Sequence, residues 1–448
     1  MFSKVKRLLA PVLCLVLLFA LTACSSNDKK ETTKSEGTKT EANKTNDKKN
    51  EDKKAVTISY AIPSSQANNE AITNAIEAWE TKTGNKIDLQ SIPDDQYDSV
   101  VKARIAGGDG IDIFKGPFQV HDVENTMVEL SDEAFVDRIS EPVLDSLMFD
   151  GKVYGFPGAE GVSSFGFFYN KDAFEKAGIT NVPTTFEEFD KVCSTLKEKG
   201  INPIFISGKD GWTLLQHRNA VSGAIYQENN KVWEQLNNNE IKWTDINEFK
   251  VQYEALANWA KKEYINERFL TATYEEAMNE VATGTSAMLL NGSWVVAGIL
   301  GYNADANIGF IPLPTSKGTP SIPVSGYGGG YHIAKTSKYV DTAKDFLRFV
   351  IDPENVVAYI KNAPGIVAYN DVQEIEGLPK VFDEIKAYIE KGQNAPHGDT
   401  KYIVPMNNNE IIAIYQELLA GRISVDEFIE AHHKSYESNA KAANIPNF

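Results

Sequence analysis

Residues Asp150 to Phe189 read DGKVYGFPGAEGVSSFGFFYNKDAFEKAGITNVPTTFEEF, and they are the most informative segment of the chain. The segment from Gly155 to Gly161 is rich in Gly and Pro, which disfavours a long helix because both residues are costly in helix interiors. The apolar run from Phe165 to Tyr169 is short enough for a buried strand. Thr185 then begins a helix, with Glu188 three residues further on, which is a capping-box pattern. We interpret the stretch as the passage of the chain from one folded lobe into a second.

Apolar stripes on the predicted helices show which residues belong to the core. Cys193 lies on the apolar face of the helix that Thr185 begins, so we expect a buried apolar residue rather than a nucleophile. Trp79 lies on the stripe of an earlier helix and is expected in the core rather than at a ligand. The other cysteines are Cys14 and Cys24, so no intrachain disulfide is expected.

The opening stretch also resembles the hinge-crossing segment of ABC-transporter solute-binding proteins of extracellular family 1, the maltose-binding-protein-like group. The resemblance rests on three runs: Tyr154-Gly155-Phe156-Pro157, Phe168-Tyr169-Asn170-Lys171-Asp172, and Pro183 to Phe189. It implies an α/β, two-lobed, periplasmic-binding-protein-like (type II) fold with three hinge crossings. It also implies a binding protein rather than an enzyme.

Length and charge limit the class of protein. A chain of 448 residues is long enough for two cores, and 42% hydrophobic with 24% charged residues is typical of a globular protein. The formal net charge is −17; residues 1–23 carry +3 and residues 24–54 carry +2, so residues 55–448 carry −22. A body this acidic lacks the positive field that holds phosphate backbones, so no nucleic-acid partner is expected.

The first residues have the pattern of an export signal. Three basic residues precede an apolar run from Leu8 to Leu21, which fits a secretory leader over residues 1–23 and is shorter than the roughly 20 residues that span a bilayer. Leu21-Thr22-Ala23-Cys24 resembles the bacterial lipobox, which implies a diacylglycerol on Cys24. Two acyl chains, at about 0.8 kcal/mol for each buried CH2 group, hold a protein stably on a membrane. The alternative is a plain secretory leader with a chance cysteine.

Residues 24–54 are expected to form a disordered tether. From residue 25 onward they contain no aromatic or large aliphatic side chain, so they cannot build a core. A tether of roughly thirty residues has a mean reach on the order of 30 Å, which keeps the body close to a membrane partner.

The first part of the body alternates strands and helices. Strands are predicted at Val56–Ile62, Lys86–Ile92 and Ile111–Phe114, with helices over 67–81 and 96–106 between them. This order predicts a parallel sheet, in which ligands sit beyond the carboxyl ends of the strands. In the family these turns are binding loops. The resemblance therefore implies that four residues of the loops face a ligand: Ser65, Gln66, Asp94 and Phe114.

Further candidates for the cleft come from the second part of the chain. Trp212 stands in a polar loop after a strand predicted over 203–207. Its ring could form part of the cleft wall or pack locally, and the sequence favours neither role over the other. The run ATGTSAMLLNGSW, residues 282–294, resembles the family's segment that places an aromatic ring in the cleft, which implies Asn291 and Trp294. The alternative is Asn291 as a helix cap and Trp294 as core. Glu160 is a candidate carboxylate of the cleft, and Tyr327 is a candidate aromatic ring of the cleft.

Two more crossings between the lobes are expected. Ile308–Pro314 and Gly326–Ile333 look like the strands of the second crossing, and Asn362–Ile366 is the third, after which helices run to the end. The expected lobes are residues 55–160 plus 326–362 and residues 161–325 plus 363–448. His432 and His433 would point about 100° apart on a helix and are expected to be exposed rather than to share a metal.

These features favour a receptor that delivers a small molecule to a membrane permease. A pyranose presents apolar C–H faces and a rim of hydroxyl groups, which aromatic rings and polar side chains match. We expect a lipid-anchored, extracytoplasmic monomer that binds a sugar or oligosaccharide for an ABC importer, without metal or cofactor. The alternatives are a receptor for a non-sugar solute, a passive surface protein, and a surface glycosidase. A glycosidase needs two carboxylates about 5 to 10 Å apart, and no local motif pairs two.

Overall fold

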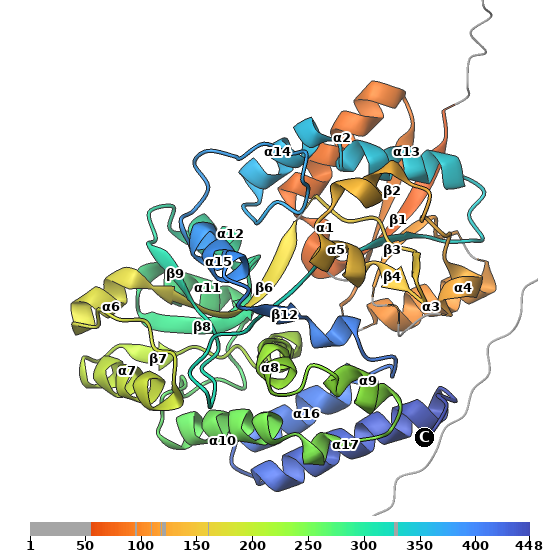
Figure 1. Ribbon diagram of the computed structural model, residues 1–448. Helices are drawn as coiled ribbons and strands as arrows, with labels where there is room; N and C mark the ends of the chain where they lie inside the picture. The colour runs from red at the N-terminus through yellow and green to blue at the C-terminus, as the bar shows by residue number, and fades with distance from the viewer. Residues whose placement is uncertain are drawn as a thin grey trace, which may run out of the picture. The chain divides into compact units, whose positions relative to one another are not determined.

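The computed structural model describes residues 55–448 except 95, 109, 117, 119–121, 160 and 327–329. The leader, Cys24 and the tether therefore lie outside the described residues, and so do Glu160 and Tyr327. The body is built on two main sheets (Figure 1), one of four strands and one of six, with a separate pair of short strands.

The first sheet has the strand order β11-β3-β1-β2. Strands β1 and β2 run parallel, from the pair Thr57 and Lys86 to the pair Pro63 and Ile92, and β3 is parallel to β1. Strand β11 is antiparallel to β3. The predicted parallel sheet at the start of the body is confirmed. Its strands are β1 (Thr57–Pro63), β2 (Lys86–Ile92), β3 (Ile113–Lys115) and β11 (Tyr331–Ile333).

Helix α2 (Glu70–Thr83) shows why the sequence forms this layer. The side chain of Asn69 accepts a hydrogen bond from the backbone N–H of Ala71 at the start, and Gly84 ends the helix with a φ of 74°. Trp79 is fully buried, as predicted, and its indole N–H donates to Asp345 at 3.0 Å. The first sheet and the helices grouped with it are called the first half of the body, and the second sheet with its helices the second half. The other helices of the first half are α1 (Ser64–Ala67), α3 (Tyr97–Gly107), α4 (Val123–Thr126), α5 (Glu141–Ser146), α13 (Val340–Val350) and α14 (Pro353–Asn362), with the strand pair β4 (Met148–Phe149) and β5 (Lys152–Val153).

The second sheet has the order β12-β10-β6-β8-β7, with β9 also paired to β6. All nine residues of β6 are buried, which explains why its sequence, VSSFGFFYN, is apolar without strict alternation. Strand β6 is antiparallel to β8, β9 and β10, whereas β7 is parallel to β8 and β12 is parallel to β10. The strands are β6 (Val162–Asn170), β7 (Asn202–Ile204), β8 (Ser286–Gly292), β9 (Ile308–Ile311), β10 (Ile322–Gly326) and β12 (Asn394–Pro396).

Helices cover the second sheet: α8 lies against its strands, and α10, α16 and α17 lie side by side in a layer beyond α8 (Figure 1). The predicted capping box is confirmed, because Thr185 and Glu188 exchange hydrogen bonds at the start of α7, and Cys193 on that helix is fully buried. The helices are α6 (Lys171–Ala177), α7 (Phe186–Glu198), α8 (Leu215–Glu228), α9 (Val232–Asn237), α10 (Asn247–Lys261), α11 (Tyr274–Thr283), α12 (Val295–Tyr302), α15 (Val381–Glu390), α16 (Asn408–Leu419) and α17 (Val425–Ala442).

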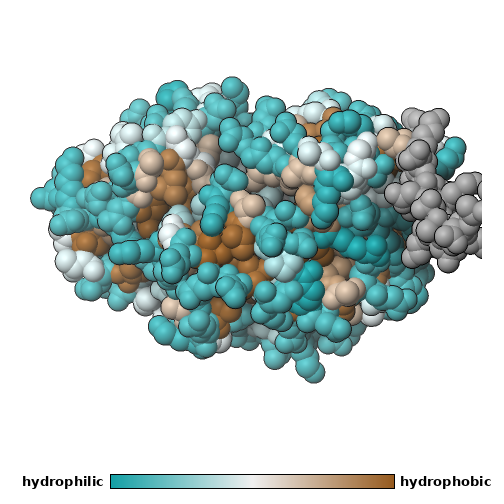
Figure 2. Space-filling view, turned by 90° about the horizontal axis from the view of Figure 1, so that it is seen from above, coloured by the Kyte–Doolittle hydropathy of each residue, from teal (hydrophilic) through white to brown (hydrophobic). Residues whose placement is uncertain are grey.

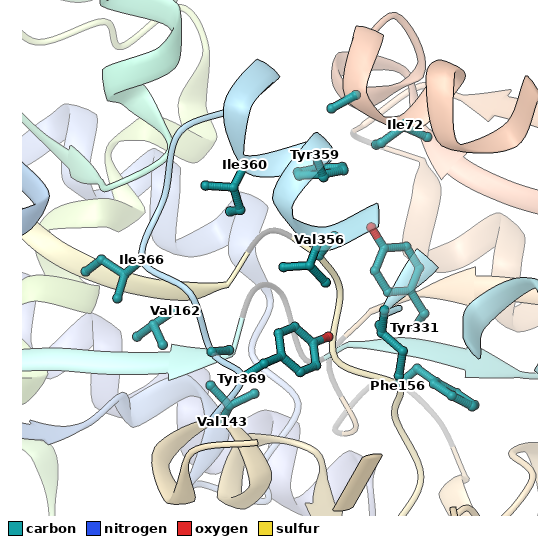
Figure 3. Close-up of a cluster of buried hydrophobic side chains, with 14 of the residues drawn as sticks. Ile72, Val143, Phe156, Val162, Tyr331, Val356, Tyr359, Ile360, Ile366 and Tyr369 are labelled. Atoms are coloured by element: carbon teal, nitrogen blue, oxygen red, sulfur yellow. The ribbon is translucent and has the colours of Figure 1, made fainter. Parts of the chain in front are cut away.

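The chain passes between the two sheets three times, as predicted. It enters β6 after Phe156, returns between β10 and β11, and passes again after α14. The passages pair with one another, since Phe156 bridges to Tyr331 and Val162 bridges to Ile366. Figure 3 shows the apolar cluster at this place, in which Tyr369 also lies. The Tyr369 hydroxyl donates to the carbonyl of Gly158 at 2.9 Å, so the third passage is tied to the first.

Two predictions for the last part of the chain are wrong. Helices do not simply run to the end, because β12 adds a strand to the edge of the second sheet. His432 and His433 are not exposed: His432 is fully buried and His433 is 7% exposed. The His432 ring faces α10, where it meets Phe249 edge-on at 5.1 Å, and it meets Trp243 edge-on with centroids 4.6 Å apart.

The surface view (Figure 2) is mainly hydrophilic, and hydrophobic residues gather in a hollow near the middle of that face. Of the described residues, large hydrophobic side chains that are markedly exposed occur singly, at Tyr302, Tyr339 and Ile403. Scattered residues of this kind are normal for globular proteins.

Candidate functional site

The loops that leave the two sheets face the crossings. In the first sheet β1, β2 and β3 end at Pro63, Ile92 and Lys115, and β11 begins beside the end of β3. In the second sheet β7, β8, β10 and β12 run in one direction, and β10 ends where the chain crosses to β11. The carboxyl edges of both sheets are therefore joined by the crossings. Such edges are where ligands bind in open α/β sheets.

A pocket lies between elements of the two sheets, with a volume of about 90 Å³. The first half supplies Gln66 of α1, Asn69 and Tyr359; the second supplies Ser163 of β6 and Trp294 at the start of α12. The rest of its lining is Ile72, Val162, Ser293, Ala297, Ala363, Pro364 and Gly365. Small-molecule sites usually have volumes of about 300–1,000 Å³. A ligand larger than a few atoms therefore needs the walls of this pocket to move apart.

Gln66 links the pocket to a buried cation. The Gln66 side-chain oxygen lies 3.3 Å from the ammonium of Lys115, which is 4% exposed and stands 4.6 Å from the centre of the Tyr331 ring. The Tyr97 hydroxyl donates to the carbonyl of Ala61 and accepts from the backbone N–H of Lys115, each at 2.9 Å. Burial raises the pKa of Tyr97 well above its ordinary value, so the hydroxyl stays protonated. The ends of β1 and β3 are thus held together at the pocket.

Asp94 and Ser65 shape the same corner without lining the pocket. One carboxylate oxygen of Asp94 accepts from the hydroxyl of Ser64 at 2.9 Å and from the backbone N–H of Ser65 at 3.0 Å. These bonds fasten the loop after β2 to the start of α1. Both residues are exposed, so they lie at the rim of the corner that carries Gln66.

The indole of Trp294 is half-buried in the wall of the pocket. Its ring meets the ring of Phe165 edge-on, with centroids 5.7 Å apart and planes at 82°. The ring also lies over the backbone of Gly292, two residues earlier in the chain. Trp294 is therefore neither fully exposed nor part of the core.

Asn291 does not share the pocket with Trp294. It is 1% exposed, and its side-chain oxygen accepts from the backbone N–H of Gly292 at 2.8 Å. It lines a different cavity inside the second half, together with His217 and Tyr415. The alternative of a helix cap does not hold either, because α12 has no side-chain cap.

Phe114 and Trp212 also lie outside the pocket. Phe114 is fully buried in β3, where its ring packs against His332 at 5.3 Å, so it belongs to the core. Trp212 is half-buried in a short turn after β7 and meets Tyr274 edge-on at 4.9 Å, which is local packing. Of the nine ligand-binding residues predicted from the sequence, Gln66 and Trp294 are the two that line this pocket among those the structure describes.

Residues 62–357 match the model of the family described as "Bacterial extracellular solute-binding protein". The chain belongs to this family. The resemblance stated from the sequence is confirmed, and the protein is an extracytoplasmic solute-binding protein, a class of binding proteins rather than of enzymes.

Individual relatives of this solute-binding protein cover most of its length. The multiple sugar-binding protein of Streptococcus mutans is 25% identical over 324 residues, which is 69% of this chain and 75% of that protein. The melibiose/raffinose/stachyose-binding protein MelE of Bacillus subtilis is 23% identical over 403 residues, 86% of this chain and 89% of that protein. Among solved structures, a chitin oligosaccharide binding protein has a TM-score of 0.72 at 23% identity, covering 86% of this chain and 99% of that one. This structural likeness supports the two-lobed type II fold.

The sequence reading of this solute-binding protein missed several residues around the pocket. Asn69, Ser163 and Tyr359 were not singled out, because a polar residue in a turn or an aromatic residue on a helix carries no distinctive pattern. His397 was missed because β12, the strand before it, has three residues and ends in proline.

His397 is buried behind the pocket wall, with its ring stacked on Phe165 at 4.5 Å and 25°. Burial lowers its pKa to about 4, so the ring is neutral near pH 7. Beside it Arg218 pairs with Asp399 at 2.9 Å. Burial has the largest single effect and acts to raise the pKa of the Asp399 carboxyl, but the charge of Arg218 and the hydrogen bonds from Tyr402 and Arg218 together hold that pKa below its ordinary value.

The described residues also bear on metal binding and on membrane insertion. Within the part of the chain that the structure describes, no three His, Cys, Asp or Glu side chains gather in a way that could hold a metal ion. Within that same part, every helix is too short or too polar to cross a membrane.

Proposed function

We propose that this solute-binding protein is the receptor of an ABC importer and binds a neutral sugar or oligosaccharide between its lobes. The observation that carries the proposal is the pocket that is lined by Gln66 of the first half and by Trp294 of the second. The two relatives named for sugars support the choice of ligand.

The chemistry of the pocket fits a pyranose ring. Trp294 offers an apolar face for the C–H groups of the sugar, while Gln66, Asn69 and Ser163 offer amide and hydroxyl groups to its rim. The described residues that line the pocket include no Asp, Glu, Lys or Arg side chain. Such a lining favours a neutral ligand, because a charged one would lose hydration without gaining a partner there.

The crossings give the protein a way to open. We propose lobes of residues 55–160 plus 326–362 and residues 161–325 plus 363–448, which turn about the three crossings. A ligand that contacts both lobes favours the closed arrangement by the difference between its contacts in the two states. The small volume of the pocket supports this view, since a sugar enters only when the lobes part. The bound sugar is released unchanged to the permease.

The amino-terminal segment supports a place on the outer face of the cell membrane. We propose that residues 1–23 are removed as a leader, that Cys24 carries the lipid, and that residues 24–54 tether the body close to the permease, which it serves as a monomer. Acyl mass on Cys24 and a globomycin-sensitive precursor are the expected results. Release of the mature protein without acyl mass would rule out the anchor and leave the sugar proposal untouched.

The experiment that tests the function is calorimetric titration with a panel of neutral mono- and oligosaccharides. We expect saturable binding of at least one member, weakened by at least tenfold in Trp294→Ala. Tyr302→Ala is the matched control, because Tyr302 is 49% exposed on the same helix α12 and does not line the pocket. Binding of phosphate esters or polyamines, with no response to any sugar, would replace the neutral-sugar proposal by a receptor for another solute.

A further inference from the structure

The wall of the pocket is built around a glycine that leaves room for the Trp294 ring. A Cβ atom added to Gly292 would lie 2.0, 2.2 and 2.5 Å from three ring atoms of Trp294. Distances this short do not occur in real structures, so any side chain at 292 forces the indole to move. Gly292 has no positive φ, and so the glycine is needed here for space rather than for backbone conformation.

A second contact fixes the ring from the side. Gly292 and Phe165 are directly opposite one another on the paired strands β8 and β6. Residues opposite each other on paired strands point to the same face of the sheet. Phe165 therefore stands beside the gap that Gly292 leaves, and its ring meets the indole edge-on.

The Phe165 ring is itself held from behind. Phe165 is 3% exposed and is stacked on the ring of His397, the residue that directly follows β12. The Nδ1 atom of His397 lies 3.5 Å from the hydroxyl of Ser325 on β10. The rings of His397, Phe165 and Trp294 thus form one row that ends in the pocket. Phe165 belongs to β6, while His397 and Trp294 follow the ends of β12 and β8.

We propose that Gly292 and Phe165 are positioning residues, which hold the Trp294 ring in the orientation that receives a sugar face. This inference rests on the proposed function only in assigning the ligand; the orientation of the ring is a property of the free protein. A ring that is already fixed loses little conformational freedom when a ligand arrives. The same fixed ring limits which sugar faces fit, so these two residues contribute to specificity without touching the ligand.

The first test uses the free protein and the Gly292→Ala variant. The fluorescence and near-UV circular dichroism of Trp294 are isolated as the difference from Trp294→Phe. We expect Gly292→Ala to change this difference spectrum, with unfolding still cooperative. Gly301→Ala is the matched control, since Gly301 lies on α12 with no atom within 4 Å of an added Cβ, and its spectrum should equal that of the wild type. An unchanged Trp294 spectrum in Gly292→Ala would overturn the proposal.

The second test measures affinity for the sugar that binds best in the calorimetric panel. We expect binding about tenfold weaker or worse in Gly292→Ala and about three- to tenfold weaker in Phe165→Leu, which keeps an apolar side chain but loses the edge-on ring contact. Wild-type affinity in both variants, with Trp294→Ala impaired, would contradict the positioning role. If Trp294→Ala itself binds normally, the proposed site fails, and the spectra of the free protein still decide whether Gly292 orients the ring.

Discussion

The ammonium group of Lys401 pairs with the carboxylate of Asp145, and this pair joins the segment after β12 to helix α5. By the lobes proposed above, it connects one lobe to the other. The two side chains are 24% and 45% exposed, so water screens their attraction. Besides the three crossings, this pair is a further contact between the lobes, and it can break when the lobes turn.

We expect removal of this pair to change ligand affinity modestly. An exposed ion pair contributes about 0–1 kcal/mol, so Lys401→Ala and Asp145→Ala should each alter the dissociation constant of the bound sugar by up to about fivefold, and the double variant no further. Calorimetry on the four proteins of the cycle measures the coupling. Breaking the pair of Lys250 and Asp426, which lies within the second half, is the control and should leave affinity unchanged. Full additivity of the two single effects would show that Lys401 and Asp145 act separately.

Gly161 is expected to be indispensable to the first crossing. Its φ is 80°, and an added Cβ would lie 1.8 Å from the backbone oxygen of Ile366, which accepts the N–H of Val162 at 2.8 Å. Gly161→Ala should therefore lower the free energy of unfolding by roughly 2–4 kcal/mol, from overpacking and a left-handed backbone together.

Gly84→Ala is the control for backbone strain alone, because Gly84 has a φ of 74° with nothing within 4 Å of an added Cβ. It should cost only about 1 kcal/mol. Urea unfolding of the two variants and the wild type compares them. Equal losses of unfolding free energy for both glycines would contradict the close contact between Gly161 and the backbone of Ile366.

Acid should weaken the second lobe through its buried histidines. Burial lowers the pKa of His217 to about 3 and that of His397 to about 4, against about 6.5 in the unfolded chain. Between these values the unfolded state binds more protons than the folded one. The stability from the neutral rings is therefore complete above pH 6.5 and is lost as the pH falls toward 4 and then 3. We expect a loss of several kcal/mol between pH 7 and pH 4.

His397→Gln checks that prediction. The variant lacks one of these protonation sites, so its unfolding free energy, measured by urea at each pH, should fall less steeply between pH 6.5 and pH 4 than that of the wild type. His433→Gln on helix α17, where the charges of Glu437 and Glu430 favour the protonated ring, serves for comparison and should retain most of the slope. Identical slopes in wild type and His397→Gln would contradict the role of His397.

Asn170 should matter more than an ordinary helix cap. Its side-chain oxygen accepts from the N–H of Ala173 at 2.9 Å, and its side-chain nitrogen donates to the carbonyl of Val281 at 2.8 Å. Asn170→Ala loses the cap of α6 and leaves a buried carbonyl without this donor, which we expect to cost about 2–3 kcal/mol. Thr185→Ala, which removes an exposed cap from α7, should cost about 1 kcal/mol in the same urea experiment. A smaller loss for Asn170→Ala than for Thr185→Ala would contradict this reading.

The sequence predicts this fold wherever local chemistry and tertiary packing agree. The stripe with Trp79, the capping box of Thr185 and the apolar strand around Phe167 each carry a pattern that the structure keeps. Strand β12 carries no such pattern, because a three-residue strand at a sheet edge is defined by its partner β10 rather than by its own residues.

The candidate site was less predictable for a related reason. The resemblance singles out Gln66 and Trp294, which follow strands at the carboxyl edges, but it does not say which way a neighbouring side chain points. Asn291 lies three residues from Trp294 and faces the interior, because it belongs to the strand while Trp294 begins the helix. Phe114 is the middle residue of a buried strand, whereas Lys115 after it lies next to Gln66. Such choices depend on strand register, which is set by the paired strands.

Native mass spectrometry of the freshly purified, full-length protein is the decisive measurement, because it weighs the protein together with any ligand that stays bound through purification. We predict a bound mass that corresponds to a whole number of neutral sugar residues, lost on unfolding and absent or greatly reduced in Trp294→Ala. A protein that carries no sugar, accepts none from the neutral panel and instead binds a phosphate ester or a polyamine would contradict the account.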